Sequence, residues 1–261
     1  MVYLIAILLL ILAIQYLIYN KKHSLFTETI NKTIFQEHNP VKAFELIEKE
    51  IIKSNNAERV NLLSLKFYVS VWLGYYYEAY KTLEQIQQRK RYKKICRIEF
   101  YTLLLAFFTN ENELITELYN DFLSKKGLKK TGMHNLEFRI IECLYAFHVE
   151  RNYNKYLEIF EEIKSRGLKV VIYLAMLYFY AGKAKLELGE IIESILYFSK
   201  SKVYGQHTFF NAKARDVLMK IKDEADEQNR KKVIDTIETS INQAYLELEE
   251  VTESLAKQTK K

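Results

Sequence analysis

The chain has 261 residues, of which 39 are Lys or Arg and 33 are Asp or Glu, so its formal net charge is +6. This mild basic excess does not by itself indicate a nucleic-acid-binding protein. A single Pro and seven Gly are too few for a chain that turns often through β-hairpins, so the composition favours long helices. Two cysteines, Cys96 and Cys143, lie on apolar helical faces and are expected to be buried thiols in a reducing compartment.

Residues 1–20 form an apolar segment in which Gln15 is the only polar residue between Val2 and Tyr19. An apolar helix of about 20 residues spans a bilayer. We expect a transmembrane anchor rather than a cleaved secretory signal, because no basic region precedes the segment and no small-residue cleavage site follows it. Residues 21–23 contain Lys21 and Lys22, and such basic flanks stay in the cytoplasm. The expected topology is single-pass, with the N-terminus outside and the remaining domain cytoplasmic.

Residues 24–222 show the periodicity of paired helices. We expect hairpins at 24–53, 57–88, 94–126, 133–165 and 168–202, with a sixth unit starting at Gln206. This self-similarity, with a period of 36 to 40 residues, is typical of an α-solenoid, in which stacked hairpins supply one another's core. In the second helix of each hairpin, a small or aromatic residue is followed four positions later by an apolar one. The pairs are Ala43/Ile47, Ala79/Leu83, Tyr156/Phe160 and Ser194/Phe198, with a weaker member near Thr116/Asn120.

The segment from Tyr178 to Phe198 resembles a tetratricopeptide (TPR) repeat. The matching positions are the close-packing pair Ala181-Gly182, the turn residue Gly189, the small residue Ser194 and the aromatic Phe198, with a second partial match at Gly74, Tyr76, Ala79 and Leu83. Lys185 stands where the family has a tyrosine, and no unit ends in the usual proline. The resemblance implies an all-α, TPR-like solenoid of about five to six helical hairpins. The alternative is an irregular all-α domain without true repeats.

Residues 227–258 are predicted to form one long amphipathic, coiled-coil-like helix. Its apolar positions recur at steps of three and four, across about three heptads. This seam fits either self-association through a coiled coil or a capping helix on the last repeat, and the sequence leaves both open. The seam consists of Ile234, Ile237, Ile241, Ala244, Leu248, Val251 and Leu255.

Enzyme signatures are missing from the sequence. It has no Gly-rich phosphate loop, no Cys-x-x-Cys motif and no metal-ligand spacing among its five histidines. We therefore expect a protein that is not an enzyme and that carries no metal or cofactor.

In TPR-like solenoids the first helices of the hairpins line a concave groove that accepts a peptide or a helix. The resemblance therefore implies a partner-binding groove here. Tyr and Trp suit recognition because they supply rigid surface with a polar group, although packing in the core is the alternative for each. The Lys/Asn set with which some family members hold a C-terminal carboxylate is not evident. The expected groove residues are Asn61, Tyr68, Trp72, Tyr101, Tyr145, His148 and Lys183.

Charges divide between the two edges expected of a stack of hairpins. Glutamates recur in the turns within hairpins, and basic residues recur in the turns between them. The basic membrane-facing edge consists of Arg89, Lys90, Arg91, Lys93, Lys94, Lys125, Lys126, Lys129 and Lys130, continued by Arg97, Lys164, Arg166, Lys169, Lys200 and Lys202. One hypothesis places this edge against the anionic inner leaflet. The alternative is that these residues complement helix dipoles. Nucleic acid is not expected as a partner, because the chain is expected to be anchored in a membrane.

Together these features predict a membrane-anchored scaffold or adaptor that binds an unknown protein or peptide partner at the cytoplasmic face. The layout is similar to bacterial envelope-assembly proteins and to mitochondrial outer-membrane import receptors, and the residue bias favours a bacterial cell membrane. One alternative is a regulatory sensor that responds to a ligand or peptide. Another is a structural membrane protein that forms homo-oligomers through its C-terminal helix.

Overall fold

The computed structural model describes residues 24–34, 36–54, 56–88, 97–124, 133–168 and 170–258. Within these segments every element is a helix or a connecting turn, which confirms the predicted all-α class. No helix in this part of the chain is long and apolar enough to cross a membrane. The expected anchor, residues 1–20, and its flank, residues 21–23, lie outside the described residues.

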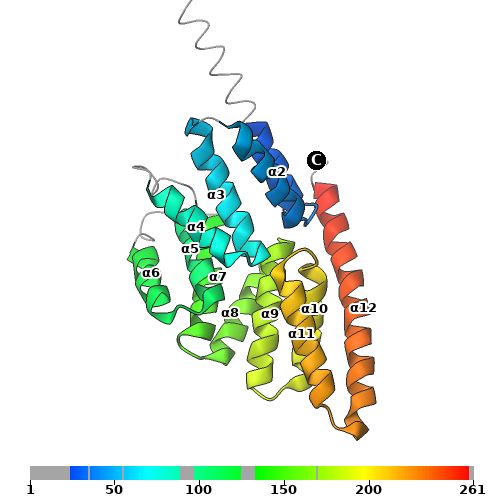
Figure 1. Ribbon diagram of the computed structural model, residues 1–261. Helices are drawn as coiled ribbons and strands as arrows, with labels where there is room; N and C mark the ends of the chain where they lie inside the picture. Colours follow the sequence, from blue (N-terminus) through cyan, green and yellow to red (C-terminus); the bar gives the residue numbers. More distant parts are fainter. Residues whose placement is uncertain are drawn as a thin grey trace, which may run out of the picture.

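The helices succeed one another as antiparallel neighbours, and most contacts join elements that are one or two places apart in the chain (Figure 1). Each hairpin expected from the sequence contains two of these helices, the expected sixth unit contains the next one, and the separate long helix expected at 227–258 is the last element. After the helical residues 24–34, the elements are α2 (Pro40–Lys53), α3 (Asn56–Leu73), α4 (Tyr76–Gln87), α5 (Ile98–Thr109), α6 (Asn112–Ser124), α7 (Met133–His148), α8 (Tyr153–Ser165), α9 (Val171–Glu187), α10 (Ile191–Tyr204), α11 (Phe209–Glu224) and α12 (Glu227–Gln258).

The turns within the first five hairpins share one backbone feature. Each has a residue with positive φ two positions before its second helix begins. This left-handed conformation suits Gly and, less well, Asn, so two turns contain Gly and a third contains Asn. The five residues are His38, Gly74, Asn110, Arg151 and Gly189.

The same turns correct one position of the predicted repeat. In each second helix, the buried repeat residue donates its backbone N–H to the residue that follows the left-handed one. In the third hairpin the donor is Ile115, which bonds to Glu111 and is fully buried, whereas Thr116 and Asn120 are exposed. The third member of the repeat is therefore Ile115/Tyr119. Sequence alone missed it because Ile115 is neither small nor aromatic.

Close helix packing explains one of the glycines noted in the sequence. A Cβ placed on Gly182 of α9 would lie 2.9 Å from a ring carbon of Phe198 on α10. Both residues are buried. The missing side chain at Gly182 thus lets the ring of Phe198 approach the α9 backbone, and this contact joins the two helices of the hairpin.

Aromatic side chains fill the space between the first helices of the hairpins. The indole of Trp72 on α3 lies 5.5 Å from the ring of Tyr173 on α9 and 6.5 Å from that of Phe210 on α11. The ring centroids of Phe108 on α5 and Phe210 are 5.4 Å apart. Gly74 approaches Phe209 so closely that a Cβ on it would lie 2.9 Å from the Phe209 Cβ. The succession of hairpins therefore curves until α3 meets α11, and the core extends through its inner side.

The long C-terminal helix α12 packs along α10 and, to a lesser extent, α11 (Figure 1). Its predicted seam faces this contact: Ala244 is fully buried, and Ile237, Ile241, Leu248 and Val251 pack against the core. The Lys200 Nζ on α10 pairs with Glu247 Oε2 at 2.7 Å. In this structure α12 covers the last hairpin, as a capping helix does.

Candidate ligand-binding site

The seven residues expected to line one groove are divided among several environments. Trp72 and Tyr101 are 1% and 2% exposed, and the Trp72 Nε1 donates to the Tyr101 Oη at 3.4 Å. Tyr68 is half-buried and stacks on Tyr101, with ring centroids 4.2 Å apart. These three side chains belong to the aromatic core, which is the alternative that the sequence allowed. Trp72 and Tyr101 present almost no surface to a partner.

Two more of the seven lie apart from this cluster. Tyr145 on α7 is half-buried and stacks on Tyr119 of α6, with centroids 3.9 Å apart. Asn61 is exposed near the start of α3. Neither residue lines the pocket that contains the remaining two, His148 and Lys183.

His148 and Lys183 lie together at an open pocket of about 320 Å³. Its walls come from α5, α7, α9 and α11, which are first helices of four successive hairpins. We call it the lysine pocket. It is lined by Phe108, Asn110, His148, Phe179, Tyr180, Lys183, Lys213, Asp216 and Val217.

His148 is the last residue of α7 and is only 6% exposed. Its imidazole packs among the rings of Phe107 and Tyr180, at centroid distances of 5.3 and 4.9 Å. The buried Nε2 has no hydrogen-bond partner among the described residues. Burial, together with the positive charges of Lys183, Lys213 and Arg151, lowers the pKa of His148 to about 3. The ring is therefore neutral near pH 7.

The two lysines bring positive charge to the same pocket. The Lys183 Nζ lies 5.5 Å from the ring centroid of Phe147, and the Lys213 Nζ lies 4.8 Å from that of Phe209. Desolvation lowers the pKa of Lys183, and the charge of Arg151 contributes in the same direction although Glu187 opposes it. Desolvation also lowers the pKa of Lys213, followed by repulsion from Lys183.

The charge of Glu187 offsets part of the effect of desolvation on Lys183. In the described part of the chain, neither ammonium group forms an ion pair with Asp or Glu. Asp216 lines the pocket, but its Oδ1 pairs with the Arg215 Nη2 at 3.5 Å on the exposed surface of α11. The lysine pocket is therefore positive and has aromatic walls. It holds hydrogen-bonding groups that a ligand can use.

Sequence reasoning found His148 and Lys183 but missed Lys213 and Asp216. Both missed residues are on α11, in the sixth hairpin, and they reach the pocket only because the hairpins curve toward one another. The helical periodicity of the sixth unit predicts Phe209, Phe210, Ala214 and Leu218 on its inner face; Phe210, Ala214 and Leu218 are buried in the core, and Phe209 is partly buried against it. No sequence signal indicated that its polar face would meet α7 and α9.

The nine residues of the predicted basic membrane-facing edge, Arg89 to Lys94 and Lys125 to Lys130, lie outside the described residues, as does Lys169. Several basic residues that continue this edge are paired with acids. Arg97 Nε lies 2.8 Å from the Oε1 of the buried Glu137, and Lys164 Nζ lies 2.6 Å from Glu161 Oε2. Arg166 pairs with Glu162. These ion pairs therefore neutralise part of the positive charge of this edge within the domain.

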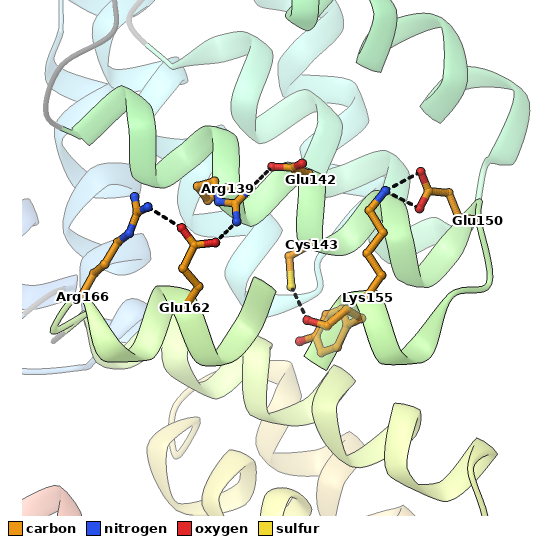
Figure 2. A network of polar contacts seen from close by, with 8 residues as sticks. Arg139, Glu142, Cys143, Glu150, Lys155, Glu162 and Arg166 are labelled. Carbon is orange, nitrogen blue, oxygen red and sulfur yellow. Dashed lines mark hydrogen bonds and ion pairs between the residues drawn. The ribbon is translucent and has the colours of Figure 1, made fainter. Parts of the chain in front are cut away.

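Figure 2 shows the ionic network that joins α7 to α8. Arg139 bridges Glu142 on its own helix and Glu162 on α8, and Glu162 also holds Arg166. Cys143 is fully buried beside this network and donates to a backbone oxygen on α8 at 3.5 Å. Burial raises the pKa of its thiol well above the usual value, so the thiol is unreactive. We assign the network a structural role, because it lies between two packed helices.

Among the described residues, no group of His, Cys, Asp and Glu side chains has the arrangement of a metal site. No protein-family model, curated protein or solved structure matches the chain.

Proposed function

We propose that this protein is a membrane-anchored, TPR-like scaffold that binds a protein or peptide partner at the cytoplasmic membrane face. The lysine pocket is the observation that carries the binding part of the proposal. It is open to solvent, is lined by helices of four hairpins, and contains Lys183, Lys213 and the His148 imidazole, whose Nε2 has no hydrogen-bond partner in the part of the chain that the structure describes. A partner would bind there rather than over Trp72 and Tyr101.

Two structural features support the repeat part of the proposal. The left-handed residue recurs at the same place in five hairpins, and contacts between helices are mostly sequential. The packing of Phe198 against Gly182 also agrees with the roles that the TPR resemblance assigns to these residues. The anchor part rests on the apolar sequence of residues 1–20 and on the lysines that follow it.

The test is a crosslinked affinity purification of the tagged full-length protein from detergent-solubilised membranes. The wild type is compared with the double variant Lys183→Met/Lys213→Met, which removes both charges and keeps most of each stem. Lys220→Met is the matched control, since Lys220 is an exposed lysine of α11 that does not line the pocket. Loss of a near-stoichiometric partner in the double variant alone would support the proposal. Recovery of the protein by itself would contradict it.

A second candidate function, a ligand-responsive sensor, is favoured by the size of the pocket. A volume of about 320 Å³ lies within the usual range of small-molecule sites, roughly 300–1,000 Å³. The third candidate, self-assembly through α12, loses its main support because most of the seam already packs against the core. Thermal stabilisation by a small ligand, without any protein partner, would distinguish the sensor from the scaffold.

A further inference from the structure

Helix dipoles and unpaired helix ends do not account for both lysines of the pocket. Lysines in the last turn of a helix are stabilised by the helix dipole, and in α9 the lysine of the last turn is Lys185, whereas Lys183 lies just before that turn. The dipole does not account for Lys213, which lies in the second turn of α11, where the helix dipole disfavours a cation. The helix ends at the pocket do not need the lysines either, because turn N–H groups already bond to the carbonyls of Ala106 and Ala146.

Lys183 and Lys213 line one pocket and their like charges repel each other, so a bound anion would stabilise the site. The Lys183 and Lys213 ammonium groups can each donate to an oxyanion. The Nε2 of His148, as an N–H tautomer, can donate a third hydrogen bond, and none of the described residues accepts one from it. Such three-point contact would satisfy the buried nitrogen and reduce the repulsion between the lysines.

The remaining walls indicate what the anion is attached to. Phe108, Phe179 and Tyr180 surround the pocket with apolar surface and aromatic rings. Apolar walls with a few converging polar groups are typical of sites that bind a small organic ligand or an inserted side chain. A fully hydrated inorganic ion would leave this aromatic surface unused.

We infer that the lysine pocket binds a carboxylate attached to an apolar or aromatic group, with Lys183, Lys213 and His148 as its hydrogen-bond donors. The inference rests on the proposed function, since it names the chemistry recognised by the same pocket. The carboxylate can belong to a free small acid or to an acidic side chain in a partner segment. Both sources present the same group to the same three donors.

The experiment uses the purified full-length protein in a non-ionic detergent, with chloride as the only buffer anion. Binding of phenylacetate is measured by ligand-observed NMR and compared with phenylacetamide, which has the same ring but no charge. Two peptides with both ends blocked, Ac-LDF-NH₂ and Ac-LNF-NH₂, test whether a side-chain carboxylate is recognised without a free C-terminus.

We expect phenylacetate to bind and phenylacetamide to bind at least tenfold more weakly, as charge-assisted hydrogen bonds predict. Lys213→Met and Lys183→Met should each weaken phenylacetate binding about tenfold, and Lys220→Met should leave it unchanged. Circular dichroism melting shows whether each variant remains folded. Lys213 has an exposed side chain, so its replacement gives a test that does not depend on the packing of Lys183.

The peptides distinguish the sources. Preference for Ac-LDF-NH₂ over Ac-LNF-NH₂ indicates a partner segment, whereas binding of phenylacetate alone indicates a free acid; both support the inference. Equal binding of acid and amide, or acid binding that is unchanged in the folded Lys213→Met variant, would overturn it. If a protein partner is captured through the pocket but the pocket does not prefer carboxylates, the carboxylate inference is wrong and the proposed scaffold function still holds. If carboxylates bind but no protein partner is captured, the carboxylate inference holds and the proposed scaffold function is wrong.

Discussion

The buried imidazole of His148 makes the stability of the domain depend on pH. Its pKa is about 3 in the folded state, against 6.5 for an unperturbed histidine. Because the folded pKa is lowered, the stabilising contribution is present above pH 6.5 and is lost as the pH falls from 6.5 toward 3. Each pH unit within this window removes about 1.4 kcal/mol. Lowering the pH from 7 to 5 should therefore reduce the free energy of unfolding by about 2 kcal/mol through His148 alone.

The assay compares wild type with His148→Gln, which has a side chain of similar size that does not titrate. Urea unfolding is followed by the fluorescence of Trp72, the only tryptophan, which lies in the core. His38 also has a lowered pKa, from burial and from His207, and it contributes equally to both proteins. The wild type should lose about 2 kcal/mol more than the variant between pH 7 and pH 5. Equal losses would refute the claim that His148 is buried and neutral.

Three further predictions concern the packing of the fold. Gly182→Ala should lower stability by about 1–3 kcal/mol in thermal unfolding, because the new methyl group meets the ring packed against it. Glu137→Gln should cost about 3 kcal/mol in urea unfolding, because it removes the buried negative charge that lies 2.8 Å from the Arg97 Nε. Leu248→Lys should destabilise the protein by about 2 kcal/mol, since this side chain packs against the core, whereas Leu246→Lys should have little effect because Leu246 is 64% exposed.

Each of these predictions has an outcome that would contradict its reasoning. An unchanged melting temperature for Gly182→Ala would mean that α9 and α10 are packed less closely than described. A loss below 1 kcal/mol for Glu137→Gln, comparable to that for the exposed pair member Glu224→Gln, would place the Arg97 pair among ordinary surface pairs. Equal effects of the two leucine replacements, or oligomers that dissociate with Leu248→Lys, would indicate that the seam of α12 pairs with another chain.

The hairpins could be predicted from sequence because helical periodicity and turn residues are local signals. The predicted repeat positions differ from the structure only in the third hairpin, where the local signal is atypical. Ile115 occupies a position that in the other hairpins is small or aromatic. The burial of Trp72 and Tyr101 in the core could not be predicted from such local signals. Periodicity places both on the inner side of the first helices, but only the curvature of the whole array decides whether that side is an open groove or a filled core.

The candidate site also depends on contacts between distant helices, which local sequence signals do not predict. His148 and Lys183 were found because they lie on the inner faces of neighbouring hairpins. Lys213 reaches them from a later hairpin, through the curvature that also brings Phe209 next to Gly74. The burial that lowers the pKa of His148 and the repulsion between Lys183 and Lys213 arise only when these helices meet.

The central claim, that the lysine pocket is where a partner binds, is tested most directly by photocrosslinking in intact cells. A photoreactive amino acid replaces Asp216, which lines the pocket, or Met219, which is exposed on the same helix outside it. We predict one discrete adduct from position 216, lost in the Lys183→Met/Lys213→Met background, and none from position 219. No adduct from position 216, or the same adducts from both positions regardless of the lysines, would contradict the account.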